Sequence, residues 1–260
     1  MDLQLKDKVI VVTGGAKGIG AAIVRACASE GAIPVIVDQD VEAGNQLHLE
    51  LRVAESANAF IKADLTSAAA CADAVKEIAE EFGRIDALVN NAGRNDKIGL
   101  ENGSPHQFVE SLGRNLLHYY NMAHYALPHL KHSRGCIVNI ASKTAVTGQG
   151  GTSGYVAAKG AILGLTREWA AELLDSGIRV NAVLPAEVMT PLYRQWLSSF
   201  PDPEKKLESI VAKIPFQKRM TTAEEIAATT VFLISEKSGH TTGQHIFVDG
   251  GYTHLDRALT

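Results

Sequence analysis

Long apolar runs are missing from this chain of 260 residues, and so are clusters of basic residues. No apolar stretch approaches the roughly 18 residues that a membrane-spanning helix needs. The first residues, Met1 to Lys6, lack the apolar core of a signal peptide. The lysines and arginines are dispersed, and the net charge of −4 predicts no positive surface for nucleic acid. We therefore expect no membrane partner and no nucleic-acid partner.

Cysteine is also scarce, with only Cys27, Cys71 and Cys136 in the chain. An odd number of widely spaced cysteines in apolar patterns indicates reduced core residues of a cytoplasmic protein, and it argues against a disulfide framework. Proline-rich linkers, low-complexity tracts and internal repeats are absent as well. With 46% apolar residues, the chain is predicted to form a single domain over residues 1–260.

What the chain does contain is a regular alternation of short apolar strands with helical patterns. The strands are predicted at 9–13, 33–37, 58–61, 86–90, 136–141, 178–184 and 245–248. Such alternation is typical of an α/β fold in which helices cover both faces of a parallel sheet. We expect a doubly wound, seven-stranded sheet of Rossmann type, with ligands beyond the carboxyl ends of the strands.

A glycine-rich turn follows the first predicted strand. Its sequence, Gly14-Gly-Ala-Lys-Gly18-Ile-Gly20, leads into a helical pattern at 21–30, and the next strand ends in Asp38. Glycines let the backbone approach a pyrophosphate, and the start of a helix offers free amide donors. The spacing differs from Gly-x-Gly-x-x-Gly, and an ordinary tight turn is the alternative interpretation. With Asp38 at the right distance, the pattern predicts a dinucleotide site.

Tyr155 and Lys159 are four residues apart, and Ser142 precedes them. On a helix this spacing places two side chains on one face, so the lysine ammonium can favour the ionised phenol. A free tyrosine has a pKa near 10, too high for a base at neutral pH. Taken alone, the pair also fits a partly buried tyrosine above a solvated lysine, and Ser142 also fits a turn or cap serine.

Further motifs occur in the order found in short-chain dehydrogenases/reductases: Thr13-Gly14, Asp64-Leu65, Asn90-Asn-Ala-Gly93, Asn115 and Asn181-x-x-x-Pro185. From about Leu5 to Tyr252 the chain resembles that family. The resemblance implies a nicotinamide-dependent enzyme acting on CH–OH groups. It also implies four catalytic residues: Tyr155 as the base, Lys159 beside it and on the nicotinamide ribose, Ser142 on the substrate oxygen, and Asn115 in a proton relay.

The same resemblance implies a set of cofactor-binding residues: Gly14, Lys17, Gly18, Ile19, Gly20, Asp38, Asp64, Leu65, Asn91, Ala92, Gly93, Tyr155, Lys159, Pro185, Val188 and Thr190. Asp38 is placed to accept hydrogen bonds from the adenosine ribose and to repel a 2′-phosphate, which favours NAD. Lys17 favours NADP, so dual use stays open. Asp38 and Asp64 also fit helix caps. The chain has Ala186 where most relatives have glycine after the proline.

Polar residues dominate the segments that resemble the walls of the substrate pocket. The candidate substrate residues are Asn95, Lys143, Gln149, Glu187 and Trp196, with an insert near 188–216 expected to cover the pocket. A steroid or acyl pocket is more apolar. Within the family, the run from Ser142 to Gln149 and the C-terminal residues resemble the bacterial L-fucose dehydrogenases. This implies NAD-dependent oxidation of L-fucose, D-arabinose or L-galactose to the lactone. Glu187 also fits an exposed residue without a role.

Two alternatives remain at this point. One is a reductase of 3-oxoacyl thioesters or other ketones that uses NAD(P)H, and the other is a catalytically silent regulatory protein that binds the cofactor. The family resemblance also implies a homotetramer, built by the helices around 118–124 and 155–174, with the tail 252–260 reaching a neighbour. No metal site is predicted, because His118 and His124 lie in an aromatic helical pattern and His129 and His132 at its end have no matching carboxylate pattern. These histidines fit surface or interface positions.

Overall fold

Seven parallel strands form one sheet in the computed structural model, which describes residues 2–256. The strands are β1 (Val9–Thr13), β2 (Ile33–Asp38), β3 (Ala59–Lys62), β4 (Ala87–Asn90), β5 (Cys136–Ile140), β6 (Arg179–Pro185) and β7 (His245–Val248). Their order in the sheet is β3-β2-β1-β4-β5-β6-β7, and every neighbouring pair is parallel. The predicted α/β class, the seven strands and the single domain are confirmed, with strand ends within one residue of prediction.

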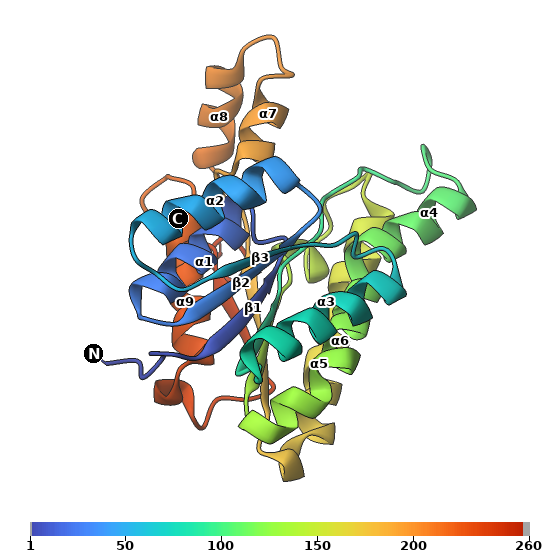
Figure 1. The fold of residues 1–260 in the computed structure, drawn as a ribbon. Coiled ribbons are helices and arrows are strands. Elements are labelled where there is room, and N and C mark those ends of the chain that lie inside the picture. Colours follow the sequence, from blue (N-terminus) through green and yellow to red (C-terminus); the bar gives the residue numbers. More distant parts are fainter. Residues whose placement is uncertain (1, 257–260) are drawn as a thin grey trace.

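Helices cover both faces of this sheet (Figure 1). On one face lie α1 (Gly18–Ser29), α2 (Val41–Val53) and α9 (Ala223–Ile234), and on the other lie α3 (Ala68–Phe82), α5 (His118–Ser133) and α6 (Ser153–Glu172). Successive strand side chains point to opposite faces, so Val9 and Val11 pack on the second group while Ile10 and Val12 pack on the first. This explains why the buried strands are apolar at every position.

Side-chain caps fix where the helices begin. Asp40 accepts a hydrogen bond from the Ala43 amide and caps α2, so the alternative that Asp38 is the cap is wrong. Ser67 caps α3 in the same way, so the alternative that Asp64 caps this helix is also wrong. Both aspartates are therefore available for other contacts at the sheet edge.

The strand order reverses between β1 and β4, because the chain steps outward from β1 to β3 and then returns to the other side of β1. In open parallel sheets, ligands bind beyond the carboxyl ends of the strands at such a reversal. The amide of Asn90 on β4 donates to Asn139 on β5 at 3.0 Å, and Asn139 donates to Thr166 on α6 at 3.0 Å. These buried contacts fix the strands that carry the loops of this edge.

The connections at the same edge contain further helices. After β4 come α4 (Pro105–Leu112) and a π-helical turn, η1 (Gly113–Leu117), which continues into α5. After β6 come α7 (Pro191–Leu197) and α8 (Pro203–Val211), which lie side by side and extend away from the sheet at the top of Figure 1. These two helices form most of the predicted insert. Within residues 2–256, no helix combines the length and apolarity required to cross a membrane.

Candidate active site

The turn after β1 and the first turn of α1 contain several positions that fit only glycine. Gly14 has a φ of +60°, and a Cβ there would lie 2.8 Å from the Ala92 Cα. A Cβ on Gly20 would lie 2.0 Å from the Gly14 carbonyl oxygen. The turn is therefore packed tightly against the start of α1, where the preceding Lys17 provides no side-chain cap. The uncapped amides and the bare backbone form a cradle suited to a phosphate group.

Two loops are tied together beside this cradle. The Asn91 side-chain amide donates to the carbonyl oxygens of Thr13 and Gly14, each at 3.0 Å. In return, the Thr13 hydroxyl accepts from the backbone amides of Asn91 and Ala92 at 2.9 and 3.2 Å. Asn91, predicted as a cofactor contact, thus fixes the cradle with its side chain. Thr13, which stood in the motif without an assigned role, completes this tie.

Asp38 lies at the end of β2 with its carboxylate next to the glycine turn. Its two oxygens accept from the backbone amides of Ala16 and Asp40, each at 3.0 Å, and each oxygen retains a lone pair for a further donor. Lys17 is engaged elsewhere, because its Nζ lies 2.5 Å from the Asp40 carboxylate. This contact raises the pKa of Lys17 and lowers that of Asp40. The lysine charge is therefore balanced locally.

Asp64 and Leu65 follow β3, the strand next to β2. The Asp64 carboxylate accepts from the amide and the hydroxyl of Thr66 at 3.0 and 2.8 Å, and these bonds lower its pKa. Leu65 is buried, and its carbonyl accepts from the thiol of Cys71. Both residues therefore belong to a well-defined turn at the sheet edge, one strand beyond Asp38.

The loop after β6 approaches the glycine turn from the opposite side. A Cβ on Gly18 would lie 3.4 Å from the Thr190 side chain. Thr190 caps α7 through the Tyr193 amide, and Val188 forms a bridge with Thr221. Ala186 does not adopt a positive φ, so alanine causes no strain where most relatives have glycine. The segment from Pro185 to Thr190 thus lies beside the glycine turn.

Tyr155 and Ser142, two of the predicted catalytic residues, lie within hydrogen-bonding contact at this edge. Ser142 lies directly after β5, and its hydroxyl accepts from the amide and hydroxyl of Thr144 at 3.2 and 3.0 Å. Tyr155 occupies the first turn of α6 and is half-buried. Its low-dielectric surroundings raise its pKa to about 12, and a hydrogen bond with Ser142 partly offsets this. Tyr155 thus needs a nearby positive charge to ionise near neutral pH.

Lys159 supplies that charge from the next turn of α6. Its Nζ lies 5.7 Å from the centre of the Tyr155 ring, so the predicted common face is observed. The ammonium donates to the Tyr119 hydroxyl at 2.9 Å and to the Ile140 carbonyl at 2.7 Å. Burial lowers the pKa of Lys159 to about 7. The sequence did not predict that another tyrosine would be its direct partner.

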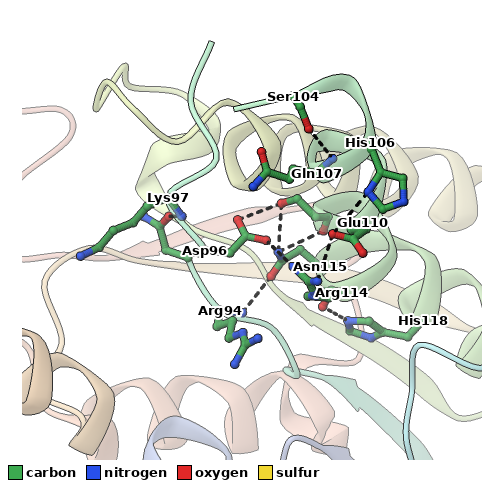
Figure 2. A network of polar contacts seen from close by, with 12 residues as sticks. Arg94, Asp96, Lys97, Ser104, His106, Gln107, Glu110, Arg114, Asn115 and His118 are labelled. Atoms are coloured by element: carbon green, nitrogen blue, oxygen red, sulfur yellow. Dashed lines mark hydrogen bonds and ion pairs between the residues drawn. The ribbon is translucent and has the colours of Figure 1, made fainter. Parts of the chain in front are cut away.

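Asn115 is buried in the π-helical turn η1 and lies in the polar network of Figure 2. Its side-chain oxygen accepts from the Arg94 amide at 2.8 Å, and its nitrogen donates to the Ser111 carbonyl at 3.1 Å. A Cβ on Gly93 would lie 2.9 Å from the Asn115 oxygen and 3.8 Å from the Lys159 Nζ. The fold therefore brings all four predicted catalytic residues to one edge.

Lys143 and Glu187 form an ion pair next to Ser142, although 44 positions separate them in the chain. The Tyr193 hydroxyl donates to the other Glu187 oxygen at 2.7 Å, and the Lys143 Nζ lies 3.7 Å from the centre of the Tyr252 ring. Burial and the adjacent carboxylate raise the pKa of Tyr193 above its usual range. We refer to Lys143, Glu187, Tyr193 and Tyr252 as the polar wall. Glu187 is thus not a solvated residue. Tyr193 lies within the predicted insert, whereas Tyr252 was not predicted to lie near Lys143.

The other predicted substrate residues are placed less centrally. Trp196 on α7 packs edge-on against Tyr193, with ring centres 5.1 Å apart, and so adjoins the polar wall. The Asn95 side chain accepts from the Lys97 amide within its own turn, and Gln149 lies on an exposed loop.

One expectation about the histidines is wrong. His118 is neither a surface nor an interface residue, because it is buried with 1% exposure. Its Nε2 lies 3.0 Å from the Arg114 carbonyl, and its Nδ1 is buried without a partner. Burial, aided by the nearby Lys159, lowers the pKa of His118 to about 4. The apolar helix packing around position 118 could not be inferred from an isolated polar residue.

Comparisons with known proteins cover nearly the whole chain. A family model described as enoyl-(acyl carrier protein) reductase matches residues 14–253. L-fucose dehydrogenase of Mus musculus is 41% identical over 250 residues, 95% of this chain and 89% of that protein. The crystal structure of Cj0485 dehydrogenase has a TM-score of 0.97 and 49% identity, covering 100% of this chain and 99% of that one. Aldohexose dehydrogenase of Thermoplasma acidophilum has a TM-score of 0.89 and 31% identity, covering 99% and 98%.

Proposed function

Because this chain belongs to the short-chain dehydrogenase/reductase family, we propose that it oxidises the anomeric hydroxyl of L-fucose, or of D-arabinose or L-galactose, to the lactone with NAD. The family predicted from the motifs is confirmed, and with it an oxidoreductase that uses a nicotinamide cofactor. The lactone would then hydrolyse to the sugar acid. Beyond the family, we propose the substrate, the choice of NAD and the roles of the individual residues.

Hydride transfer from a carbinol carbon requires that the hydroxyl proton leaves as well. Bound NAD would supply the hydride acceptor. In our proposal Tyr155 takes the hydroxyl proton, and the Lys159 ammonium stabilises the resulting charge on the phenol. Ser142 donates a hydrogen bond to the substrate oxygen and steadies the developing carbonyl. Asn115 holds the backbone of Arg94 beside Lys159 and so maintains the path by which a proton leaves.

The residues at the edge of the sheet fit the cofactor. The glycine cradle, with Lys17, Gly18 and Ile19 at the start of α1, would hold the pyrophosphate through backbone amides. Asp64, Leu65 and Asn91 to Gly93 would line the adenine and the nicotinamide ribose, and Pro185, Val188 and Thr190 would lie beside the nicotinamide.

The choice of NAD rests on two charges. The Asp38 carboxylate retains free lone pairs for the ribose hydroxyls and would repel a 2′-phosphate. Lys17 is the residue that favours NADP, and the Asp40 carboxylate balances its positive charge. Both contacts support NAD.

The polar wall is the observation that carries the sugar assignment. It begins at the residue after Ser142 and combines an ammonium, a carboxylate and two phenol rings. A carboxylate accepts hydrogen bonds from neighbouring hydroxyls, an ammonium donates them, and aromatic rings pack on the apolar face of a sugar ring. An acyl chain or a steroid would bury the remaining N–H groups of Lys143 and lone pairs of Glu187 without further partners, at a cost in binding free energy. Trp196 and the α7–α8 insert would cover the bound sugar.

The test is NADH formation, followed by absorbance, from a panel of aldoses, polyols and simple alcohols, with NAD and NADP in parallel. We expect turnover of L-fucose, D-arabinose or L-galactose with NAD and little response from simple alcohols. If these three sugars leave NAD unreduced at millimolar concentration, the sugar assignment is wrong. A preference for NADP would separately refute the role of Asp38.

A second candidate function rests on similarity to the 3-oxoacyl-[acyl-carrier-protein] reductase of Thermotoga maritima, which is 33% identical over 255 residues. A reductase of 3-oxoacyl thioesters would consume NADPH or NADH in the reverse direction. If a 3-oxoacyl thioester drives consumption of NADPH and no sugar gives NADH, this second function replaces the first. The proposed catalytic residues would be the same.

We also propose a cytoplasmic homotetramer. The outer side of α5 carries Tyr120, which is 53% exposed and stacks on His124, and such aromatic surface suits a helix pairing between subunits. The three free cysteines are buried, as in a reduced compartment. Within the C-terminal tail, Tyr252 contacts Lys143 of its own chain, and residues 257–260 lie outside the described part. A stable monomer in size-exclusion chromatography at micromolar concentration would refute the tetramer.

A further inference from the structure

A second tyrosine, Tyr119 on α5, is bonded to the lysine of the proposed catalytic set. Its side chain is fully buried, and its hydroxyl lies 2.8 Å from the Ile140 carbonyl and 2.9 Å from the Lys159 Nζ. The same carbonyl lies 2.7 Å from the Lys159 Nζ. A carbonyl only accepts, so the Tyr119 hydroxyl donates its proton to Ile140 and presents its lone pairs to the ammonium.

We propose that Tyr119 is a positioning residue: together with the Ile140 carbonyl, its hydroxyl oxygen keeps the buried Lys159 ammonium charged and in place beside Tyr155. This inference rests on the role that the proposed function gives to Lys159. Two of the three N–H groups of the ammonium are held in this way. The third stays free for a hydroxyl of cofactor or substrate.

The charge of Lys159 depends on these two acceptors because its surroundings offer little else. The titratable groups that face it are Tyr155 on α6 and Tyr119 and His118 on α5. Burial raises the pKa of Tyr119 well above its usual value, so this phenol stays neutral. His118 is also neutral near pH 7, since its pKa is lowered to about 4. Burial alone accounts for the lowered pKa of Lys159, and no carboxylate offsets it there.

The substitution Tyr119→Phe isolates this role. Phenylalanine fills the same buried space and removes only the oxygen, while Ile140 keeps its bond to Lys159. The loss of one acceptor from a charged donor should shift the protonation equilibrium of Lys159 about tenfold, or about one pH unit downward. Tyr120→Phe is the matched control, because it removes a hydroxyl from the adjacent, exposed position of the same helix.

The first readout needs neither cofactor nor sugar. Competitive labelling of the protein with trace acetic anhydride from about pH 5 to pH 9, with mass spectrometry of the Lys159 peptide, gives the protonation midpoint of this lysine. We expect the midpoint of Tyr119→Phe to lie about one pH unit below those of wild type and Tyr120→Phe. Tyr119→Met, which also lacks the oxygen, should show the same shift and serves if the first variant folds poorly. An unchanged midpoint in a folded variant overturns the proposal.

The second readout is turnover. In Tyr119→Phe, kcat for the best substrate should fall about tenfold with KM nearly unchanged, because the loss concerns the charge beside Tyr155 and not substrate binding. A change in KM with kcat unchanged would overturn the proposal. A shifted midpoint without any sugar oxidation would support Tyr119 and refute the proposed substrate. Sugar oxidation with an unshifted midpoint would support the proposed substrate and refute the role of Tyr119.

Discussion

The ion pair of the polar wall allows a quantitative prediction. Glu187→Gln removes the carboxylate that pairs with Lys143, whose side chain is only 8% exposed, against 16% for Glu187. Removing one partner of a buried pair typically destabilises a protein by about 3–5 kcal/mol. The Tyr252 ring still faces the ammonium, and glutamine keeps one acceptor, so we expect a smaller loss of about 2–3 kcal/mol. For a chain of this size, that lowers Tm by about 4–6 °C.

Thermal unfolding followed by circular dichroism measures this loss. The matched control is Glu80→Gln, which breaks an exposed pair with Lys76 and should leave Tm within about 1 °C. The double substitution Lys143→Met with Glu187→Leu should recover much of the loss, because neither charge then remains buried and unpaired. Kinetically, Glu187→Gln should raise KM for L-fucose about tenfold. An unchanged Tm for Glu187→Gln would refute the reasoning. It would also be refuted if the double variant lost at least as much Tm as the two single substitutions added together.

Three further substitutions test the rest of the site. Tyr155→Phe should lower kcat about 10²–10⁴-fold while NADH binding, followed by fluorescence, stays nearly unchanged. Intact turnover would exclude Tyr155 as the base and reopen the interpretation as a silent cofactor-binding protein. Asp38→Ser should raise the ratio of NADP to NAD activity at least about tenfold, since it removes the charge that repels the 2′-phosphate, and an unchanged ratio of kcat/KM values would contradict the argument for NAD. Gly20→Ala places a Cβ 2.0 Å from the Gly14 carbonyl oxygen and should weaken NAD binding in calorimetry, whereas the control Gly148→Ala, with open space around it, should not.

Local patterns explain why so much of the fold was predictable. The strands are short apolar runs ended by polar or glycine residues, and several helices between them, such as α2, α3 and α9, carry side-chain caps, so most elements are defined by neighbouring residues. The glycine turn was predictable for the same reason, because only glycine tolerates the φ of Gly14 and the contact at Gly20. The pairing of Tyr155 with Lys159 required only the pitch of one helix.

Caps show where local patterns were ambiguous. Asp38 and Asp40 both precede α2, and either is chemically suited to cap it. The structure assigns the cap to Asp40 and directs Asp38 toward the glycine turn. This choice depends on the distance between β1 and β2 in the sheet. The order of residues in one loop carries no information about that distance.

By itself, the sequence determined the α/β class, the strand positions, the family and the common helix face of Tyr155 and Lys159, because all of these follow from short-range spacing and motif order. Only the tertiary structure decided which side chains meet from distant elements. Lys143 and Glu187 are 44 residues apart, and Tyr119 and Lys159 are 40 apart. They meet because parallel strands bring their carboxyl ends to one edge of the sheet and because α5 packs beside α6 on one face, and burial there makes their charges and hydroxyls depend on each other.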